Sequence, residues 1–125
     1  MTTTAAGKPA GRRLASLVLL GRAGWGSLLV LRPAAGLRLL GGPEPSGWAR
    51  PIVRTLGARH LAQVALEVTR GPAWRRLGTA VDALHAASAV AFAVVDPSWR
   101  RAALTDATIA GLFAATGLRA GGATA

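Results

Sequence analysis

Residues 86–95 read AASAVAFAVV, and Ser88 is the only polar side chain in that run. Residues 107–118 read ATIAGLFAATGL, in which Thr108 and Thr116 are the only polar side chains. Each run covers about three turns of helix, whereas a surface helix of a soluble domain presents polar side chains at every turn. The two runs therefore predict helices that are surrounded by apolar material, as in a lipid bilayer.

Working outward from these runs, the chain divides into four apolar segments. They cover residues 14–31, 52–69, 77–95 and 101–118. Each is rich in Ala and Leu and lacks period-two alternation, which favours helix over strand. A helix of about 18 residues is about 27 Å long, close to the hydrocarbon thickness of a bilayer. Because the later connections are short, we predict an all-α fold, a four-helix transmembrane bundle with up-down-up-down topology.

Proline and glycine mark the ends of the segments. Arg32-Pro33 closes the first, Gly71-Pro72 follows the second and Asp96-Pro97 closes the third. Residues 1–11 and 120–125 are small and polar, so we expect tails on either side of a membrane domain at residues 12–119. Residues 33–51 form the longest predicted loop, in which a short interfacial helix over AAGLRLL remains an alternative. Arg12-Arg13 also fits a secretory or twin-arginine signal, but the absence of a cleavage pattern favours an uncleaved first helix.

The chain carries a large basic surplus, with 15 Lys plus Arg against 5 Asp plus Glu, a formal net charge of +10. Such a surplus is typical of nucleic-acid binding or of contact with anionic lipid. Here most cations lie in the gaps between apolar segments, as do Trp48, Trp74 and Trp99, which is typical of membrane-flanking residues. We therefore expect a lipid bilayer and no nucleic acid as partner. A soluble four-helix bundle, with its internal charges on the surface, is the alternative.

The distribution of cations also bears on orientation. With four spans, one side carries seven cations: Lys8, Arg12, Arg13, Arg70, Arg75, Arg76 and Arg119. The other side carries five: Arg32, Arg38, Arg50, Arg100 and Arg101. Because cytoplasmic loops are enriched in Lys and Arg, this small excess predicts a multi-pass protein of the plasma membrane with both termini in the cytoplasm.

Several polar side chains fall inside the apolar segments, where an ionisable group is costly and normally faces the bundle interior in a pair. Counting depth from the segment ends predicts an Arg22–Asp82 pair, with His85 three residues further along the same face. The same count predicts an Arg59–Asp106 pair. His60, Gln63 and Glu67 form a second stripe on residues 52–69, at positions i, i+3 and i+7, which would also point inward. The buried polar candidates are Arg22, Arg59, His60, Gln63, Glu67, Asp82, His85 and Asp106.

These candidates leave three functional hypotheses open. Paired charges between spans most often fix helix register, which favours a structural or accessory membrane component, acting with a membrane partner or as a homo-oligomer. The first alternative is a small transporter or channel that uses Glu67, Asp82 and His85. The second is a haem- or metal-binding membrane subunit that uses His60 and His85.

No motif of a catalytic site is present. The chain has no cysteine, and it lacks the G-x-S-x-G, H-E-x-x-H and Walker A patterns. Gly21, Gly24 and Gly26 lie inside a hydrophobic segment, where small residues favour close helix packing rather than a phosphate loop. We therefore expect a protein that is not an enzyme, with no cofactor and no metal.

Two motifs carry a resemblance, TLGARHLAQ at residues 55–63 and AVDALHAAS at residues 80–88. In them the chain resembles a group of small four-span membrane proteins of high-GC actinobacteria, over roughly residues 14–118. The group shares a Gly-rich first span with an internal Arg, a Pro-rich loop and an early Asp in each of the last two spans. The resemblance implies the four-span topology, and the group has no assigned activity to carry over.

Overall fold

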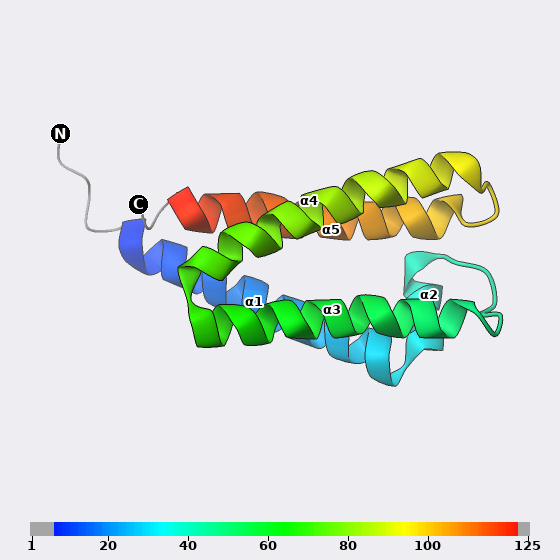
Figure 1. The fold of residues 1–125 in the computed structure, drawn as a ribbon, viewed down its shortest axis with the longest axis horizontal. Helices are drawn as coiled ribbons and strands as arrows, with labels where there is room; N and C mark the ends of the chain where they lie inside the picture. The colour runs from blue at the N-terminus through cyan, green and yellow to red at the C-terminus, as the bar shows by residue number, and fades with distance from the viewer. Residues whose placement is uncertain (1–6, 123–125) are drawn as a thin grey trace.

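The computed structural model describes residues 7–122, and within them the chain forms five helices and no strand (Figure 1). The expected all-helical fold is confirmed. Four helices are long and run alternately up and down, while one short helix lies at one end of the bundle. The helices are α1 (Gly7–Leu31), α2 (Pro33–Leu40), α3 (Ala49–Arg70), α4 (Pro72–Val95) and α5 (Arg100–Gly122).

The four long helices form two closely packed pairs that lie against each other. Helix α1 packs along α3, and α4 packs along α5; α1 also contacts α5, and α3 contacts α4. Helices α1 and α4 are therefore diagonally opposite, as are α3 and α5. The start of α1, the α3–α4 turn and the end of α5 lie at one end, which we call the terminal end (Figure 1). Helix α2 and the α4–α5 turn lie at the other, the loop end.

Several helix boundaries differ from the prediction. The predicted N-terminal tail is wrong for residues 7–11, which are helical, and the predicted C-terminal tail is wrong for residues 120–122. Residues 1–6 and 123–125 lie outside the described part of the chain. Helix α4 begins at Pro72 and so includes Trp74, which was expected in a loop. Proline suits the first turn because its missing N–H would have no partner there, and its φ is already helical.

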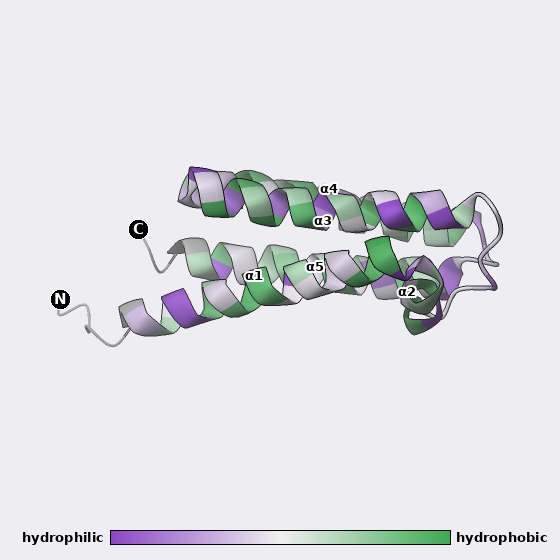
Figure 2. Cartoon of the chain, turned by 90° about the horizontal axis from the view of Figure 1, so that it is seen from below, coloured by the Kyte–Doolittle hydropathy of each residue, from purple (hydrophilic) through white to green (hydrophobic). Residues whose placement is uncertain are grey.

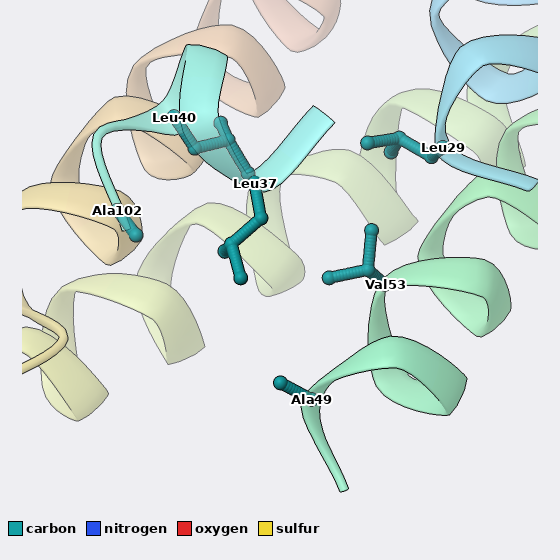
Figure 3. Packing of buried hydrophobic residues seen from close by; sticks show 6 residues of the cluster. All are labelled: Leu29, Leu37, Leu40, Ala49, Val53 and Ala102. Atoms are coloured by element: carbon teal, nitrogen blue, oxygen red, sulfur yellow. The ribbon is translucent and has the colours of Figure 1, made fainter. Parts of the chain in front are cut away.

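The alternative of a short helix inside the predicted loop is confirmed by α2. Pro33 is its first residue, and the helix ends at Gly41, whose φ of 77° is left-handed. Glycine adopts this conformation without steric cost, and its backbone N–H is bonded to the Arg38 carbonyl oxygen. Helix α2 lies at the loop end of the bundle. There its residues Leu37 and Leu40 pack against Leu29, Ala49, Val53 and Ala102 (Figure 3).

The distribution of apolar side chains is inverted relative to a soluble bundle. Most buried apolar residues are alanines, including eight in α4 and α5: Ala89, Ala93, Ala102, Ala103, Ala107, Ala110, Ala114 and Ala120. Large apolar side chains point outward along all four long helices, and hydrophobic residues recur along each of them in Figure 2. Examples are Leu17, Leu20, Val68, Leu84, Val94, Val95, Leu112 and Leu118. Small residues inside allow the helices to approach closely.

Helices α1 and α3 approach most closely at two glycines. A Cβ added to Gly57 would lie 2.6 Å from the Gly26 carbonyl oxygen, and one added to Gly26 would lie 2.9 Å from the Gly57 carbonyl oxygen. No real Cβ fits at these distances, so the crossing requires both glycines. The predicted packing role is confirmed for Gly26. It is wrong for Gly21 and Gly24, where an added Cβ would meet nothing within 4 Å.

Candidate functional site: the interior polar cluster

A bidentate ion pair crosses the centre of the bundle between α1 and α4. Arg22 Nη1 donates to Asp82 Oδ1 at 3.0 Å, and Arg22 Nη2 donates to Asp82 Oδ2 at 2.5 Å. Asp82 is fully buried, and Arg22 is 6% exposed. The predicted Arg22–Asp82 pair is therefore confirmed. Because α1 and α4 are diagonally opposite, this pair bridges two helices that do not pack against each other directly.

Gln63 on α3 joins this pair from a third helix. Its Oε1 accepts from Arg22 Nη1 at 2.8 Å, and its Nε2 donates to the Gly78 carbonyl oxygen at 3.2 Å. The same Nε2 lies 3.5 Å from Asp82 Oδ1. Gln63 thus uses both ends of its amide and ties α1, α3 and α4 together. Its predicted inward orientation is confirmed by these contacts.

The predicted Arg59–Asp106 pair is wrong. Asp106 Oδ2 forms a 2.6 Å hydrogen bond with His85 Nε2, which joins α4 to α5. Arg59 Nη1 lies instead 3.6 Å from Asp82 Oδ1, and its guanidinium nitrogens are buried without a hydrogen-bond partner within the described residues. Depth along a helix fixes the height of a side chain but not its direction around the axis. At that height Asp106 faces the adjacent α4.

An aromatic ring that the sequence analysis did not single out fills the space beside the central pair. The Cζ of Arg22 lies 4.4 Å from the centroid of the Phe113 ring, a cation–π geometry. The His60 ring, 1% exposed, lies 5.5 Å from the same ring, centroid to centroid. Phe113 is one of two phenylalanines and stands in a segment otherwise made mostly of small residues, which is the signal that could have identified it.

Glu67 is not part of the central cluster. Its Oε1 accepts from Arg75 Nε at 2.5 Å, an ion pair that spans the α3–α4 turn at the terminal end. Glu67, Asp82 and His85 were grouped in the transporter hypothesis, yet each has a different partner. Those partners are Arg75, Arg22 and Asp106 respectively.

The formal charges of the interior balance when histidine is counted as neutral. Arg22 and Arg59 contribute two positive charges, and Asp82 and Asp106 contribute two negative ones, so their sum is zero. Of the eight candidates, Arg22, His60, Asp82 and Asp106 are buried, and the other four are partly buried. Within residues 7–122, no group of three or more His, Asp or Glu side chains is arranged to hold a metal ion. The cluster can hold the helices in register without leaving a net charge in the interior of the bundle.

Comparison with models of known protein families, with curated proteins and with solved structures found no match. The resemblance to small actinobacterial membrane proteins therefore stays a prediction. Function has to be argued from the geometry of the bundle and its interior cluster.

Proposed function

We propose that this chain is a four-span integral protein of the plasma membrane that acts as a structural or accessory component and not as an enzyme. The observation that carries the proposal is the inverted bundle: large apolar side chains outside, small residues and balanced charges inside. A soluble bundle would bury its leucines and valines and expose its charges. In lipid, the arrangement found here is the favourable one, because large apolar side chains face the hydrocarbon and the central Arg22–Asp82 pair is bonded within the bundle.

Two helices are individually long and apolar enough to cross a bilayer, α1 at Pro9–Leu31 and α4 at Pro72–Val95. Helices α3 and α5 are not apolar enough to be identified as spans on their own. Their partnership with α1 and α4 supports a crossing for them as well, because Arg59 and Asp106 face partners inside the bundle. The packing of α3 and α5 supports the four-span topology, whereas the hydropathy of single helices supports only two spans.

The accessory role rests on the pairing of the interior acids. Asp82 is held by Arg22 and Gln63, and Asp106 by His85. A carboxylate whose lone pairs are used in this way is suited to fixing helix register, and poorly suited to abstracting a proton from a substrate. A component of this kind acts with another membrane protein or as a homo-oligomer.

The absence of cysteine makes a direct topology test possible. Single cysteines at Ser46, Ala73 and Ser98 place one thiol in or next to each connection between the long helices, and all three positions are exposed. Intact cells or oriented vesicles are treated with a membrane-impermeant maleimide, before and after permeabilisation. Four spans require Ser46→Cys and Ser98→Cys to react from one side and Ala73→Cys from the other.

The same experiment gives the alternatives distinct signatures. If only α1 and α4 cross, Ser46→Cys and Ala73→Cys react from the same side, because α3, which lies between these two positions, does not cross the bilayer. A soluble protein would be released by alkaline carbonate, and all three of its cysteines would react under the same labelling condition. With the proposed orientation, Ala73→Cys reacts from the cytoplasmic side.

A proton pathway is the second candidate function, and one feature favours it. A crevice lined by Glu67, Arg75, Gln63 and Arg22 leads from the terminal end toward the central pair. Its volume of about 20 Å³ holds about one water molecule and no organic solute. Proton flux into proteoliposomes is measured for wild type and Glu67→Gln, with Glu44→Gln as the exposed control. Flux that depends on Glu67 supports the pathway, and the absence of flux in wild type contradicts it.

A further inference from the structure

Four arginines line one depression at the loop end, beside the first turn of α2. Arg32, Arg38, Arg50 and Arg54 surround a volume of about 390 Å³, completed by residues 33–35. No acidic residue lines it. The ion pairs formed within residues 7–122 involve other side chains, so these four guanidinium groups have no carboxylate within 4.0 Å.

Four of the remaining arginines are neutralised or bonded from within. Arg22 and Arg59 lie against Asp82, and Arg75 pairs with Glu67. Arg100 donates from Nε to the Ala93 carbonyl oxygen at 3.1 Å, which satisfies a helix C-terminus. We call the depression lined by Arg32, Arg38, Arg50 and Arg54 the arginine depression. Its concentrated positive charge is not balanced by a carboxylate of the described residues.

The helix termini at this depression increase its positive potential. Helix α2 begins at Pro33, no side chain caps its N-terminus, and its first turn lines the depression. Arg50 is the second residue of α3, whose first turn also contains no acidic residue. The N-terminus of a helix carries partial positive charge and free N–H groups. Arginines there are unfavourable unless an anion from outside is present.

The depression also lies at a particular height. Arg32 directly follows Leu31, the last residue of the apolar span in α1. In the proposed membrane orientation this is the level of the lipid headgroups. We propose that the depression is a binding site for a phosphate-class anion, in the membrane the headgroup of an anionic phospholipid. The guanidinium fork matches phosphate oxygens in a bidentate manner. The identity of the lipid source rests on the membrane function proposed above, whereas the anion chemistry does not.

The test uses the full chain purified in an uncharged detergent. Dioleoyl phosphatidylglycerol is titrated and its adducts are quantified by native mass spectrometry, with phosphatidylcholine as the neutral lipid. The test variant is Arg38→Gln/Arg50→Gln. The matched control is Arg70→Gln/Arg76→Gln, which removes the same charge from exposed positions at the terminal end. Inorganic phosphate is added as competitor in a separate arm.

Removing one cation near a lipid surface weakens binding about fivefold, so the test variant should bind phosphatidylglycerol about 30-fold more weakly than wild type. The control should stay within about twofold of wild type, because its arginines do not line the depression. If millimolar phosphate competes with the lipid, free phosphate is a second source of the ligand. If phosphate does not compete, the lipid headgroup is the ligand.

Two results would overturn the site. One is an equal loss in both double variants, which would indicate only general attraction by net charge. The other is no preference for phosphatidylglycerol over phosphatidylcholine together with no phosphate binding. Alkaline carbonate extraction of the cell membranes, carried out before the detergent step, separates this failure from a failure of the membrane assignment. If the chain stays in the membrane but shows no headgroup preference, the proposed binding site is contradicted and the proposed membrane function is not.

Discussion

The loop end and the centre of the bundle are held together by different forces. At the loop end, α2 packs leucines against Leu29, Val53 and Ala102, with no ion pair in the cluster. In the centre, Arg22, Gln63 and Asp82 form a hydrogen-bonded network between three helices. Lipid tails can replace apolar contacts almost as well as leucine can, but they cannot hydrogen-bond a carboxylate. In a bilayer, the polar centre should therefore contribute most to the unique arrangement of the helices.

The largest effect is expected from Asp82→Asn. This change keeps the side-chain volume but leaves Arg22 and Arg59 without their neutralising carboxylate in the buried centre. We expect a loss of about 3–5 kcal/mol in the free energy of unfolding, the range for breaking a buried pair. The measurement is thermal or denaturant unfolding in detergent followed by circular dichroism. Glu44→Gln, at an exposed loop position, is the control; equal stability of the two variants would contradict the central role of Asp82.

The second-largest effect is expected from Gly57→Ala, which tests whether close packing between α1 and α3 contributes to stability. In Gly57→Ala the new Cβ would meet the Gly26 carbonyl oxygen and Leu29, so the helices have to separate. Overpacking of this kind costs about 1–3 kcal/mol. Gly24→Ala, on the same pair of helices but in open space, should instead gain up to about 1 kcal/mol from helix propensity. If both alanines changed the melting temperature in the same direction, the glycine crossing would not be the contact that sets the distance.

How much of this structure the sequence predicts depends on the kind of information required. Apolar length and proline positions predicted the four long helices, because both act locally. Depth counting predicted Arg22–Asp82, because those two side chains reach the bundle centre at the same height. It failed for Asp106, since the direction around the helix axis depends on which neighbours pack together.

Two further features could not be obtained from local patterns. The role of Gln63 depends on the Gly78 carbonyl oxygen, which only the packing of α3 against α4 brings into reach. The arginine depression joins Arg32 and residues of α2 with residues of α3. In the sequence, Arg32, Arg38 and Arg50 indicate only membrane-flanking charges. In both cases the information lies in the packing of one helix against another.

A smaller effect is expected in the coupling between α4 and α5. His85→Ala and Asp106→Ala should each destabilise the protein, and the double variant should lose about 1 kcal/mol less than their sum, since they remove one shared hydrogen bond. The parallel cycle with Arg59→Ala and Asp106→Ala should be additive within about 0.5 kcal/mol. Coupling in the second cycle and none in the first would reverse the assignment of partners made from the structure.

The smallest effect is expected at Glu67, where the polar interior reaches the terminal end. The Glu67–Arg75 pair resembles Arg22–Asp82 in chemistry, but its side chains are 15% and 17% exposed and span a short turn rather than the bundle. Water can therefore solvate either partner once the other is removed. Glu67→Gln should cost less than about 1 kcal/mol, and Glu67→Gln/Arg75→Gln no more than that, as for ion pairs near a surface. The same unfolding measurement applies. A loss as large as that of Asp82→Asn would mean that Glu67 neutralises buried charge, and the polar centre would then extend to the terminal end of the bundle.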